Sequence, residues 1–270
     1  MKHLVVFGGT GFLGRHIVNA ALKAQWKVTS VSKSGAPVLN RDATYYSADV
    51  FEPPSYEAIL SEADAVVHSM GTIFENTAYK KVLNGGLCSL PEAIPSLLSS
   101  FKGHNPMKNR DPSDADSGAS DQSQSFERLN RDSAIILAKE FAKVAKKTSP
   151  FVYISAEDWN PLVDRRYILT KRQAEMELAS QPSLRPVFVR PGFMYDSSGT
   201  SALRNHVGCA ANAVGHLGSL GASLFGSSVN FNPAIPVQVV ANAVVESLSD
   251  DSIDGVVSLE ALQKYATMTT

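Results

Sequence analysis

The sequence predicts an α/β fold, namely a doubly wound parallel sheet with helices on both faces. Short apolar runs alternate along the chain with stretches that are long enough for crossover helices, which is typical of parallel sheets. A glycine-rich turn joins the first of these runs to the first amphipathic stretch. The chain has 270 residues, of which 44% are hydrophobic and 19% charged, so it can bury a large core.

Charge and cysteine content exclude several classes of function. The 25 basic and 26 acidic residues leave a net charge of -1, which gives no reason to expect nucleic acid as a partner. Cys88 and Cys209 are too few for a disulfide framework and have no neighbour at zinc spacing, so we expect no metal site. No apolar run reaches the roughly 18 residues of a spanning helix, and the first predicted strand begins almost at Met1. We therefore expect neither a transmembrane segment nor a clear cleavable presequence.

The predicted strands are short apolar runs that suit a sheet buried on both faces. In chain order they are Lys2 to Phe7, Trp26 to Val31, Ala43 to Ser47, Ala65 to His68, Phe151 to Ile154, Pro186 to Arg190 and Val256 to Leu259.

Helices are predicted where apolar residues recur at helical spacing. These segments are Gly14 to Gln25, Phe126 to Lys147, Arg166 to Ser180 and Val237 to Leu248.

Composition divides the chain into a core and a smaller C-terminal part. Residues 1–191 form the predicted core, interrupted at about 75–125 by an insertion whose last part contains no Val, Ile or Leu. Such a stretch cannot bury itself, so we expect it to be mobile, either as a neutral insertion or as a binding loop. Residues 192–254 form a small substrate-covering region, and residues 255–270 return to the core as a last strand and tail.

The turn from Gly8 to Gly14, with the sequence GGTGFLG, stands between a predicted strand and a predicted helix. Gly8 allows a tight turn, Gly11 lets a pyrophosphate approach the backbone, and Gly14 lets the helix pack closely on the strand. Free amides at the helix start then face the negative charge. This context predicts Rossmann-type dinucleotide binding, although a fold that kept the turn and lost the ligand stays open. The predicted contacts are Gly8, Thr10, Gly11, Phe12, Leu13 and Gly14.

The end of the second strand bears on the choice of dinucleotide. NAD-binding chains carry an Asp or Glu there, about 20 residues after the turn, whereas this chain has Ser32, Lys33 and Ser34. A cation between two hydroxyls suits a 2'-phosphate, so NADP(H) is favoured over NAD(H), unless Lys33 is only a solvated loop residue. After the third strand, Asp49 is a candidate for the adenine amino group, with Val50 beside it; a surface turn explains Asp49 as well.

Tyr167 and Lys171 lie four residues apart on one face of a predicted helix. A neighbouring cation stabilises a phenolate and so lowers the phenol pKa from about 10 toward neutral pH. We expect Tyr167 to act as acid and base, with Lys171 tuning it and holding the nicotinamide ribose. Ser155 would orient the substrate oxygen, and Asn130 would bind a water behind Lys171. An ordinary structural hydrogen bond is the alternative for each residue taken singly.

These motifs resemble the extended, or atypical, short-chain dehydrogenase/reductase superfamily across nearly the whole chain. The residues that carry the resemblance are Gly8 to Gly14, Ala48 to Val50, Val66 to Gly71, Tyr167 to Lys171 and Arg190 to Gly192. The resemblance implies further cofactor contacts, which are His68, Ser69, Met70, Gly71, Pro191 and Gly192. The chain departs from the family in its enlarged loop after the fourth strand and in the missing acidic residue after the second.

Several longer strings are similar to a fungal mitochondrial group, the Coq-type dehydrogenase-like proteins of ubiquinone biosynthesis. The strings are SVSKSG from Ser30, VVHSMG from Val66, YISAEDWNPL from Tyr153, YILTKRQAEMEL from Tyr167 and RPGFMYD from Arg190. That group is related to the nucleotide-binding accessory subunit of respiratory complex I. The resemblance implies a place on the matrix side of the inner membrane, among other ubiquinone-biosynthesis proteins.

Two functions follow from these observations. The first is an NADP(H)-dependent oxidoreductase acting on a prenylated aromatic or quinone-like substrate. The second is a catalytically silent nucleotide-binding accessory or regulatory subunit of the ubiquinone-biosynthesis complex.

The N-terminal part of the sequence is poor in acidic residues. None precedes Asp42, whereas six basic residues lie in the same stretch, a composition typical of mitochondrial import signals. A phosphate-binding half that excludes carboxylates is an equally good explanation.

The stretch from Ser201 to Phe225 mixes apolar residues with several glycines. This composition predicts a lid over a hydrophobic substrate or a shallow, peripheral contact with the inner membrane. A packing surface of small residues is the alternative interpretation.

Overall fold

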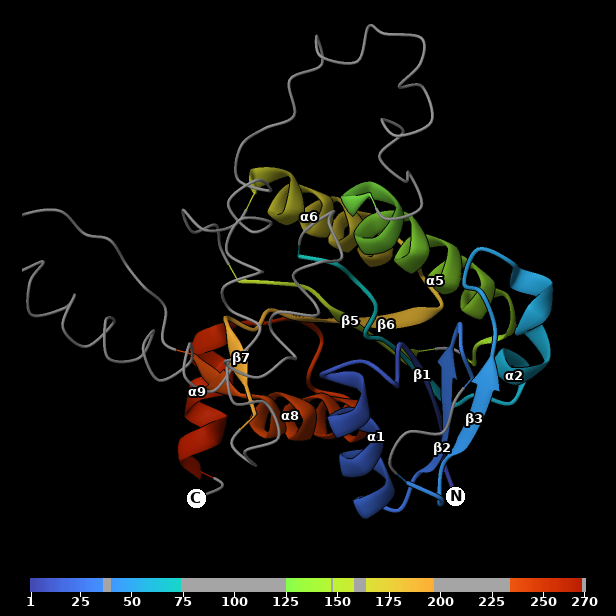
Figure 1. Ribbon diagram of the computed structural model, residues 1–270, viewed down its shortest axis with the longest axis horizontal. Coiled ribbons are helices and arrows are strands. Elements are labelled where there is room, and N and C mark those ends of the chain that lie inside the picture. Colours follow the sequence, from blue (N-terminus) through green and yellow to red (C-terminus); the bar gives the residue numbers. More distant parts are fainter. Residues whose placement is uncertain (36–39, 74–124, 147, 158–163, 197–233, 269–270) are drawn as a thin grey trace, which may run out of the picture.

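The computed structural model describes residues 1–35, 40–73, 125–146, 148–157, 164–196 and 234–268. Its centre is a seven-stranded sheet in the order β3-β2-β1-β4-β5-β6-β9, in which every neighbouring pair is parallel. Helices cover both faces of this sheet (Figure 1). The predicted α/β, doubly wound Rossmann-type fold is thereby confirmed.

Each strand of the sheet overlaps a strand predicted from the sequence. They are β1 (His3–Phe7), β2 (Lys27–Ser32), β3 (Thr44–Ser47), β4 (Ala65–His68), β5 (Ser149–Ile154), β6 (Leu184–Val189) and β9 (Gly255–Val257). Two more strands, β7 (Met194–Tyr195) and β8 (Ile235–Pro236), pair with each other outside the sheet. They are too short to leave a periodic pattern in the sequence.

The helical elements agree with the predicted ones, with four differences. They are α1 (Gly14–Lys23), η1 (Pro53–Ser55), α2 (Glu57–Ser61), η5 (Glu127–Asp132), α5 (Ser133–Val144), α6 (Arg165–Ala179), α8 (Val237–Ser249) and α9 (Leu259–Met268). The segment predicted as one helix from Phe126 begins instead with a π-helical turn, η5, before α5. Helix α9 follows the last strand where the sequence predicts only a tail, and the short elements η1 and α2 are not predicted.

The core has two apolar layers, one on each face of the sheet. In β1, Leu4 and Val6 pack with α1 and α8, whereas Val5 and Phe7 pack with α2, α5 and α6. Figure 1 shows these two groups of helices on opposite sides of the strands. Because both faces of β1 are covered, all four side chains are buried and the strand reads as a continuous apolar run.

The strand order reverses between β1 and β4, which lie side by side although β2 and β3 come between them in the chain. At this position the amide of Ser69, just after β4, donates to the carbonyl of Phe7 at the end of β1 (2.8 Å). Ligands of doubly wound sheets bind outside the carboxyl ends of the strands at such a reversal. The candidate residues after β1, β4 and β5 therefore meet along one edge of the sheet.

Part of the predicted domain organisation falls on residues that the structure does not describe. The insertion at 75–125, except for its last residue, and the stretch from Ser201 to Phe225 lie outside the described residues. Helix α8, which belongs to the predicted 192–254 region, packs against α1 in the apolar layer on one face of the sheet. The division of the chain at residue 191 stays a prediction. None of the helices in the described ranges is long and apolar enough to cross a bilayer.

Candidate functional site

The turn between β1 and α1 has the close backbone contacts that its glycines predict. Gly8 has a φ of +82°, and a Cβ added to it would lie 2.9 Å from the carbonyl oxygen of Ser69. A Cβ on Gly14 would lie only 2.1 Å from the carbonyl oxygen of Gly8. Glycine is thus required at both positions, because a side chain on Gly8 would clash with the segment after β4 and one on Gly14 would separate the helix from the turn.

The first turn of α1 carries no anion of its own. Leu13 occupies the N-cap position without a side-chain cap, and no acidic residue stands in the first turn. The amides of Arg15 and Ile17 already donate to the carbonyls of Gly11 and Leu13, so the attraction for an anion comes from the positive end of the helix dipole. Together with the glycine turn beside Thr10, Gly11 and Phe12, this end of α1 fits the pyrophosphate of a dinucleotide.

The loop after β2 is folded back against the end of β3. Ser32 accepts a hydrogen bond from the amide of Gly35 (3.2 Å), and the Ser47 hydroxyl donates to the Lys33 carbonyl (2.9 Å). Ser34 and Lys33 are exposed, and the Lys33 ammonium lies 3.3 Å from a carboxylate oxygen of Asp49. The residues predicted to bind the 2'-phosphate and the adenine are therefore neighbours.

Asp49 begins a short turn after β3. Its other carboxylate oxygen accepts a hydrogen bond from the amide of Phe51 (3.0 Å), which is the main reason that its pKa is lowered. The next residue, Val50, is buried, and its carbonyl accepts a hydrogen bond from the Tyr56 hydroxyl (2.9 Å). The turn is thus anchored with the Asp49 carboxylate ionised.

The segment after β4 meets the π-helical turn η5 at Gly71. A Cβ on Gly71 would lie 2.7 Å from Asn130 Oδ1 and 3.2 Å from Lys171 Nζ, so three predicted site residues converge here. The Asn130 side chain accepts from the amide of Thr72 (2.9 Å) and donates to its carbonyl (3.0 Å). Asn130 thereby holds the backbone after β4, and its role as a water ligand stays a prediction.

Lys171 is buried with 3% of its surface exposed, between α6 and the end of β5. Its Nζ donates to the carbonyl oxygen of Ile154 (2.7 Å) and lies 4.7 Å from the centre of the Tyr153 ring. Burial lowers the pKa of Lys171 to about 7, against an opposing effect of the Glu175 carboxylate. Both protonation states of the amine are therefore populated near neutral pH.

Tyr167 precedes Lys171 by one helical turn on α6 and is half-buried. Its ring lies edge-on against Phe126, with ring centroids 6.0 Å apart. Tyr153, near the end of β5, is fully buried, and its hydroxyl donates to the carbonyl of Asn130 (2.5 Å). Burial raises the pKa of Tyr153 and the nearby Tyr167 adds to this effect, so the Tyr153 phenol stays protonated at neutral pH.

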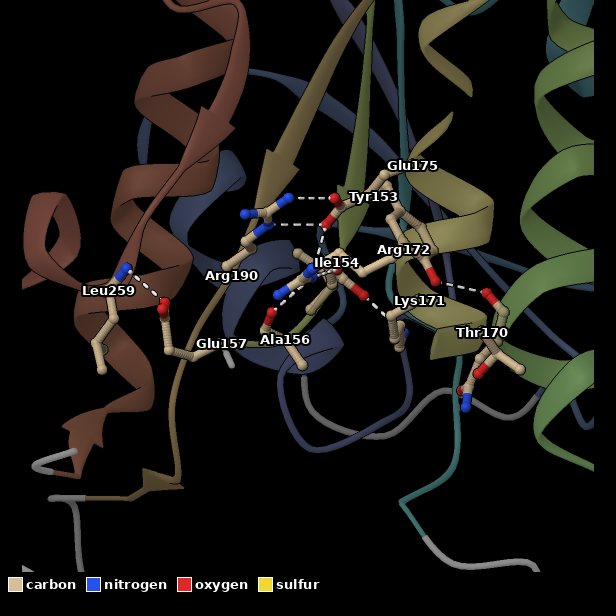
Figure 2. Close-up of polar contacts among 12 residues, drawn as sticks. Tyr153, Ile154, Ala156, Glu157, Thr170, Lys171, Arg172, Glu175, Arg190 and Leu259 are labelled. Carbon is tan, nitrogen blue, oxygen red and sulfur yellow. Dashed lines mark hydrogen bonds and ion pairs between the residues drawn. The ribbon is translucent and has the colours of Figure 1, made fainter. Parts of the chain in front are cut away.

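Ser155 and Ala156, which follow β5, are held by Arg172 of α6. Arg172 Nη1 donates to the Ser155 hydroxyl (3.2 Å) and to the Ala156 carbonyl (3.0 Å), and it pairs with Glu175 (3.1 Å). Glu175 is buried and also accepts two hydrogen bonds from Arg190, at the end of β6; the one from Nε measures 3.0 Å. Figure 2 shows Arg172 of α6 and Arg190, the residue after β6, pointing at Glu175.

Sequence reasoning missed this Arg172–Glu175–Arg190 network. Glu175 stands four residues after Lys171, on the same helical face. An acidic residue on a buried face needs a cationic partner, and this signal in the sequence could have indicated the network. Arg190 belongs to a family motif but had been given no role of its own.

The remaining predicted cofactor residues fall into two groups. Ser69 and Met70 lie at the glycine turn, where the Met70 side chain would be 3.1 Å from a Cβ on Gly8. Pro191 and Gly192 follow β6, and the Pro191 carbonyl accepts from the amide of Glu157 (3.0 Å). They are thus next to the end of β5.

His68 directs its side chain away from the glycine turn, into the layer of α5. It is fully buried, and its Nε2 lies 2.9 Å from the hydroxyl of Ser133. Burial, with a smaller contribution from Lys171, lowers the pKa of His68 to about 3, so the ring is neutral. A cofactor contact from His68 would come from its backbone.

A second polar cluster was not found from the sequence. The buried carboxylate of Asp196, after β7, accepts from Gln238 of α8 (2.7 Å) and lies 3.5 Å from both Arg15 and His16 of α1. Asp196 and Arg15 are 181 residues apart, which no local pattern could connect. The cluster joins the first turn of α1 to the C-terminal part of the chain.

Comparisons with known proteins agree with this architecture. Residues 4–82 match the NAD dependent epimerase/dehydratase family. The chain is 34% identical over 284 residues to MIOREX complex component 2 of Saccharomyces cerevisiae, an alignment that covers 97% of this chain and 98% of that protein. It is 25% identical to an uncharacterized chloroplastic protein of Arabidopsis thaliana, covering 98% of this chain and 77% of that protein.

Among solved structures, the UDP-glucose 4-epimerase of Thermus thermophilus in complex with NAD has the same fold. The TM-score is 0.57 at 15% sequence identity, and the match covers 98% of this chain and 83% of the epimerase. The likeness in fold therefore extends well beyond residue 82, where the family match ends.

Proposed function

Because this chain belongs to the extended short-chain dehydrogenase/reductase family, we propose that it is an NADP(H)-dependent oxidoreductase of ubiquinone biosynthesis. Its substrate would be a prenylated aromatic or quinone-like compound. The observation that carries the proposal is the convergence of the glycine turn, Gly71 and Lys171 at the reversal of strand order.

Dinucleotide binding is supported by the backbone at the end of β1. The Gly8 and Gly14 contacts bring the start of α1 against the turn, and no side chain of the first turn neutralises its amides. Ligand phosphates would bind there, and the nicotinamide would lie toward Gly71 and the end of β5.

The preference for NADP(H) is supported by the loop after β2. Lys33 is 87% exposed and free to turn toward a phosphate, and residues 32–35 contain no carboxylate that would repel one. Asp49 offsets part of this charge, although an exposed ion pair contributes no more than about 1 kcal/mol. We therefore expect the Lys33 ammonium to leave its ion pair with Asp49 and to pair with the 2'-phosphate when NADPH binds.

The catalytic roles follow from positions around the end of β5. The cofactor supplies or accepts a hydride when bound. Tyr167 would exchange the proton of the substrate oxygen, and Ser155, held by Arg172, would orient that oxygen. Lys171 would bind the nicotinamide ribose and, in its protonated form, lower the pKa of Tyr167. Asn130 fixes the backbone beside the amine.

The place of action is proposed from the resemblance to the fungal Coq-type group and from the acid-poor N-terminal stretch. On these grounds the protein would act in mitochondria, on the matrix side of the inner membrane, with other ubiquinone-biosynthesis proteins as partners. The yeast relative is named as a component of a complex, which also favours protein partners.

A nucleotide-binding accessory role is the second candidate, and one structural observation favours it. The Lys171 amine already bonds to the Ile154 carbonyl, and the Asn130 amide bonds to Thr72, so both side chains also hold the strand ends together. Bound NADPH would then act by stabilising the fold, by about 2.7 kcal/mol at a hundredfold excess over its dissociation constant.

Changing Tyr167 to Phe tests these two functions against each other. The control is Tyr46→Phe, which removes the hydroxyl of an exposed tyrosine on β3. Both variants should bind NADPH like the wild type in calorimetry. In cells lacking the wild-type protein, only Tyr167→Phe should fail to restore ubiquinone if the protein is an enzyme.

If Tyr167→Phe fully restored ubiquinone, the catalytic role would be excluded and the accessory role would remain. A wild-type protein that binds neither NADPH nor NADH would overturn both functions.

A further inference from the structure

We propose that Arg128 is an adenine-binding residue, whose guanidinium group stacks on Phe51 and forms a platform for the adenine ring of the bound nucleotide. The inference rests on the proposed dinucleotide binding and adds a residue that neither the glycine turn nor the Tyr167 motif contains.

The geometry brings together two segments that are far apart in the sequence. Arg128 lies on the π-helical turn η5, and its guanidinium carbon is 3.8 Å from the centroid of the Phe51 ring. Phe51 is the last residue of the turn after β3, and its amide donates a hydrogen bond to the Asp49 carboxylate. Arg128 therefore covers the turn after β3, beside the carboxylate predicted to receive the adenine amino group.

Among the residues that the structure describes, Arg128 differs from its neighbours in forming no salt bridge. Arg131 pairs with Asp132 (2.7 Å) and Arg166 pairs with Glu127 (3.0 Å). Within the described part of the chain, no carboxylate lies in salt-bridge range of the Arg128 side chain, which is exposed. The Arg128 guanidinium lies over the aromatic face of Phe51, a position that salt-bridge formation with a described residue does not explain.

A guanidinium held flat against an aromatic ring can stack a second ring on its other side. Arginine planes stack on nucleobases as well as on aromatic side chains, since the group is planar and weakly hydrated. Phe51 would hold the guanidinium in place before the nucleotide arrives, which reduces the entropy that binding has to overcome.

The charges around Asp49 support the same orientation of the base. The Phe51 amide, Lys33 and Arg128 all favour the ionised carboxylate, which can only accept hydrogen bonds. The exocyclic amine of adenine is a donor, so it would point at Asp49 while the ring lies on Arg128. A 2'-phosphate, in contrast, would lie toward Lys33.

The test measures binding of AMP, NADH and NADPH to the full chain and to three variants. Arg128→Gln removes the platform, and Arg128→Tyr replaces it with an uncharged ring. Arg131→Gln is the matched control, because it removes the same charge from the same helical turn. Melting temperatures without ligand report whether each variant folds.

We expect Arg128→Gln to raise the dissociation constants of all three ligands by the same factor, roughly 3- to 10-fold. Arg128→Tyr should restore most of this loss, and Arg131→Gln should bind like the wild type. A loss confined to NADPH would overturn the proposal in favour of a phosphate contact. Unchanged AMP binding by Arg128→Gln would also overturn it. If the wild type binds none of the ligands, the proposed dinucleotide function itself has failed.

Discussion

The buried amine of Lys171 donates a 2.7 Å hydrogen bond to the main-chain carbonyl of Ile154, the last residue of β5. The bond joins helix α6 to the sheet at the edge where the candidate site lies. Burial of the amine away from water is what lowers the pKa of Lys171 from 10.5 to about 7. Protonation of this amine is consequently coupled to folding.

Lys171→Met should flatten the pH dependence of stability between pH 7 and 9. In this window the unfolded chain holds the lysine proton and the folded chain has released it. The free energy of unfolding of the wild type therefore rises with pH, by at most about 1.4 kcal/mol per pH unit. Urea denaturation at pH 7, 8 and 9 measures the slope.

The control for this experiment is Lys143→Met, which removes an exposed lysine paired with Glu140 on α5. It should keep the wild-type slope. Equal slopes for Lys171→Met and the wild type would show that burial does not lower the Lys171 pKa.

His68→Gln should act on the acid side of the same curve. The pKa of His68 is about 3 in the folded chain and 6.5 in the unfolded one, so the wild type loses stability as the pH falls from 6.5 toward 3. The glutamine variant should lose less stability over this range, while its slope above pH 7 stays unchanged. Identical acid limbs in urea denaturation would contradict the buried, neutral state of His68.

Glu175→Gln should destabilise the protein by about 2 kcal/mol or more. The substitution leaves Arg172 and Arg190 without their shared carboxylate in a mostly buried position. The expected loss is below that of a fully buried pair, because both guanidinium groups are partly exposed. The urea midpoint measures it, with Glu177→Gln, an exposed residue on the same helix, as control. Equal midpoints for the two variants would rule out a stabilising network.

Gly14→Ala should destabilise the protein by about 2 kcal/mol or more and should also weaken NADPH binding. The added methyl group would lie 2.1 Å from the Gly8 carbonyl, so the helix has to move away from the turn. Gly255→Ala is the control: its φ is +76° but nothing lies within 4 Å of the new Cβ, so only a backbone cost of about 1 kcal/mol is expected. A Gly14 variant as stable as the Gly255 variant would be inconsistent with the close contact.

Much of the fold could be predicted because it depends on local patterns. Apolar runs such as Leu4 to Phe7 and the glycines around α1 carry their signal within a few neighbouring residues. The same holds for Tyr167 and Lys171, whose common helical face follows from their spacing alone. The π-helical turn η5 was missed, since its residues have the same apolar spacing as an ordinary helix.

The chemistry of the site depends on contacts between residues that are distant in the chain. Spacing placed Lys171 on a helix, but its burial against the end of β5, where it bonds to the Ile154 carbonyl, decided its pKa. In the same way, the sequence contained Arg128 and Phe51 without indicating that they stack. Periodicity is a property of neighbouring residues, so it specifies helices and strands. Desolvation and charge pairing depend on which strand ends the crossover helices bring together, and this only the folded chain determines.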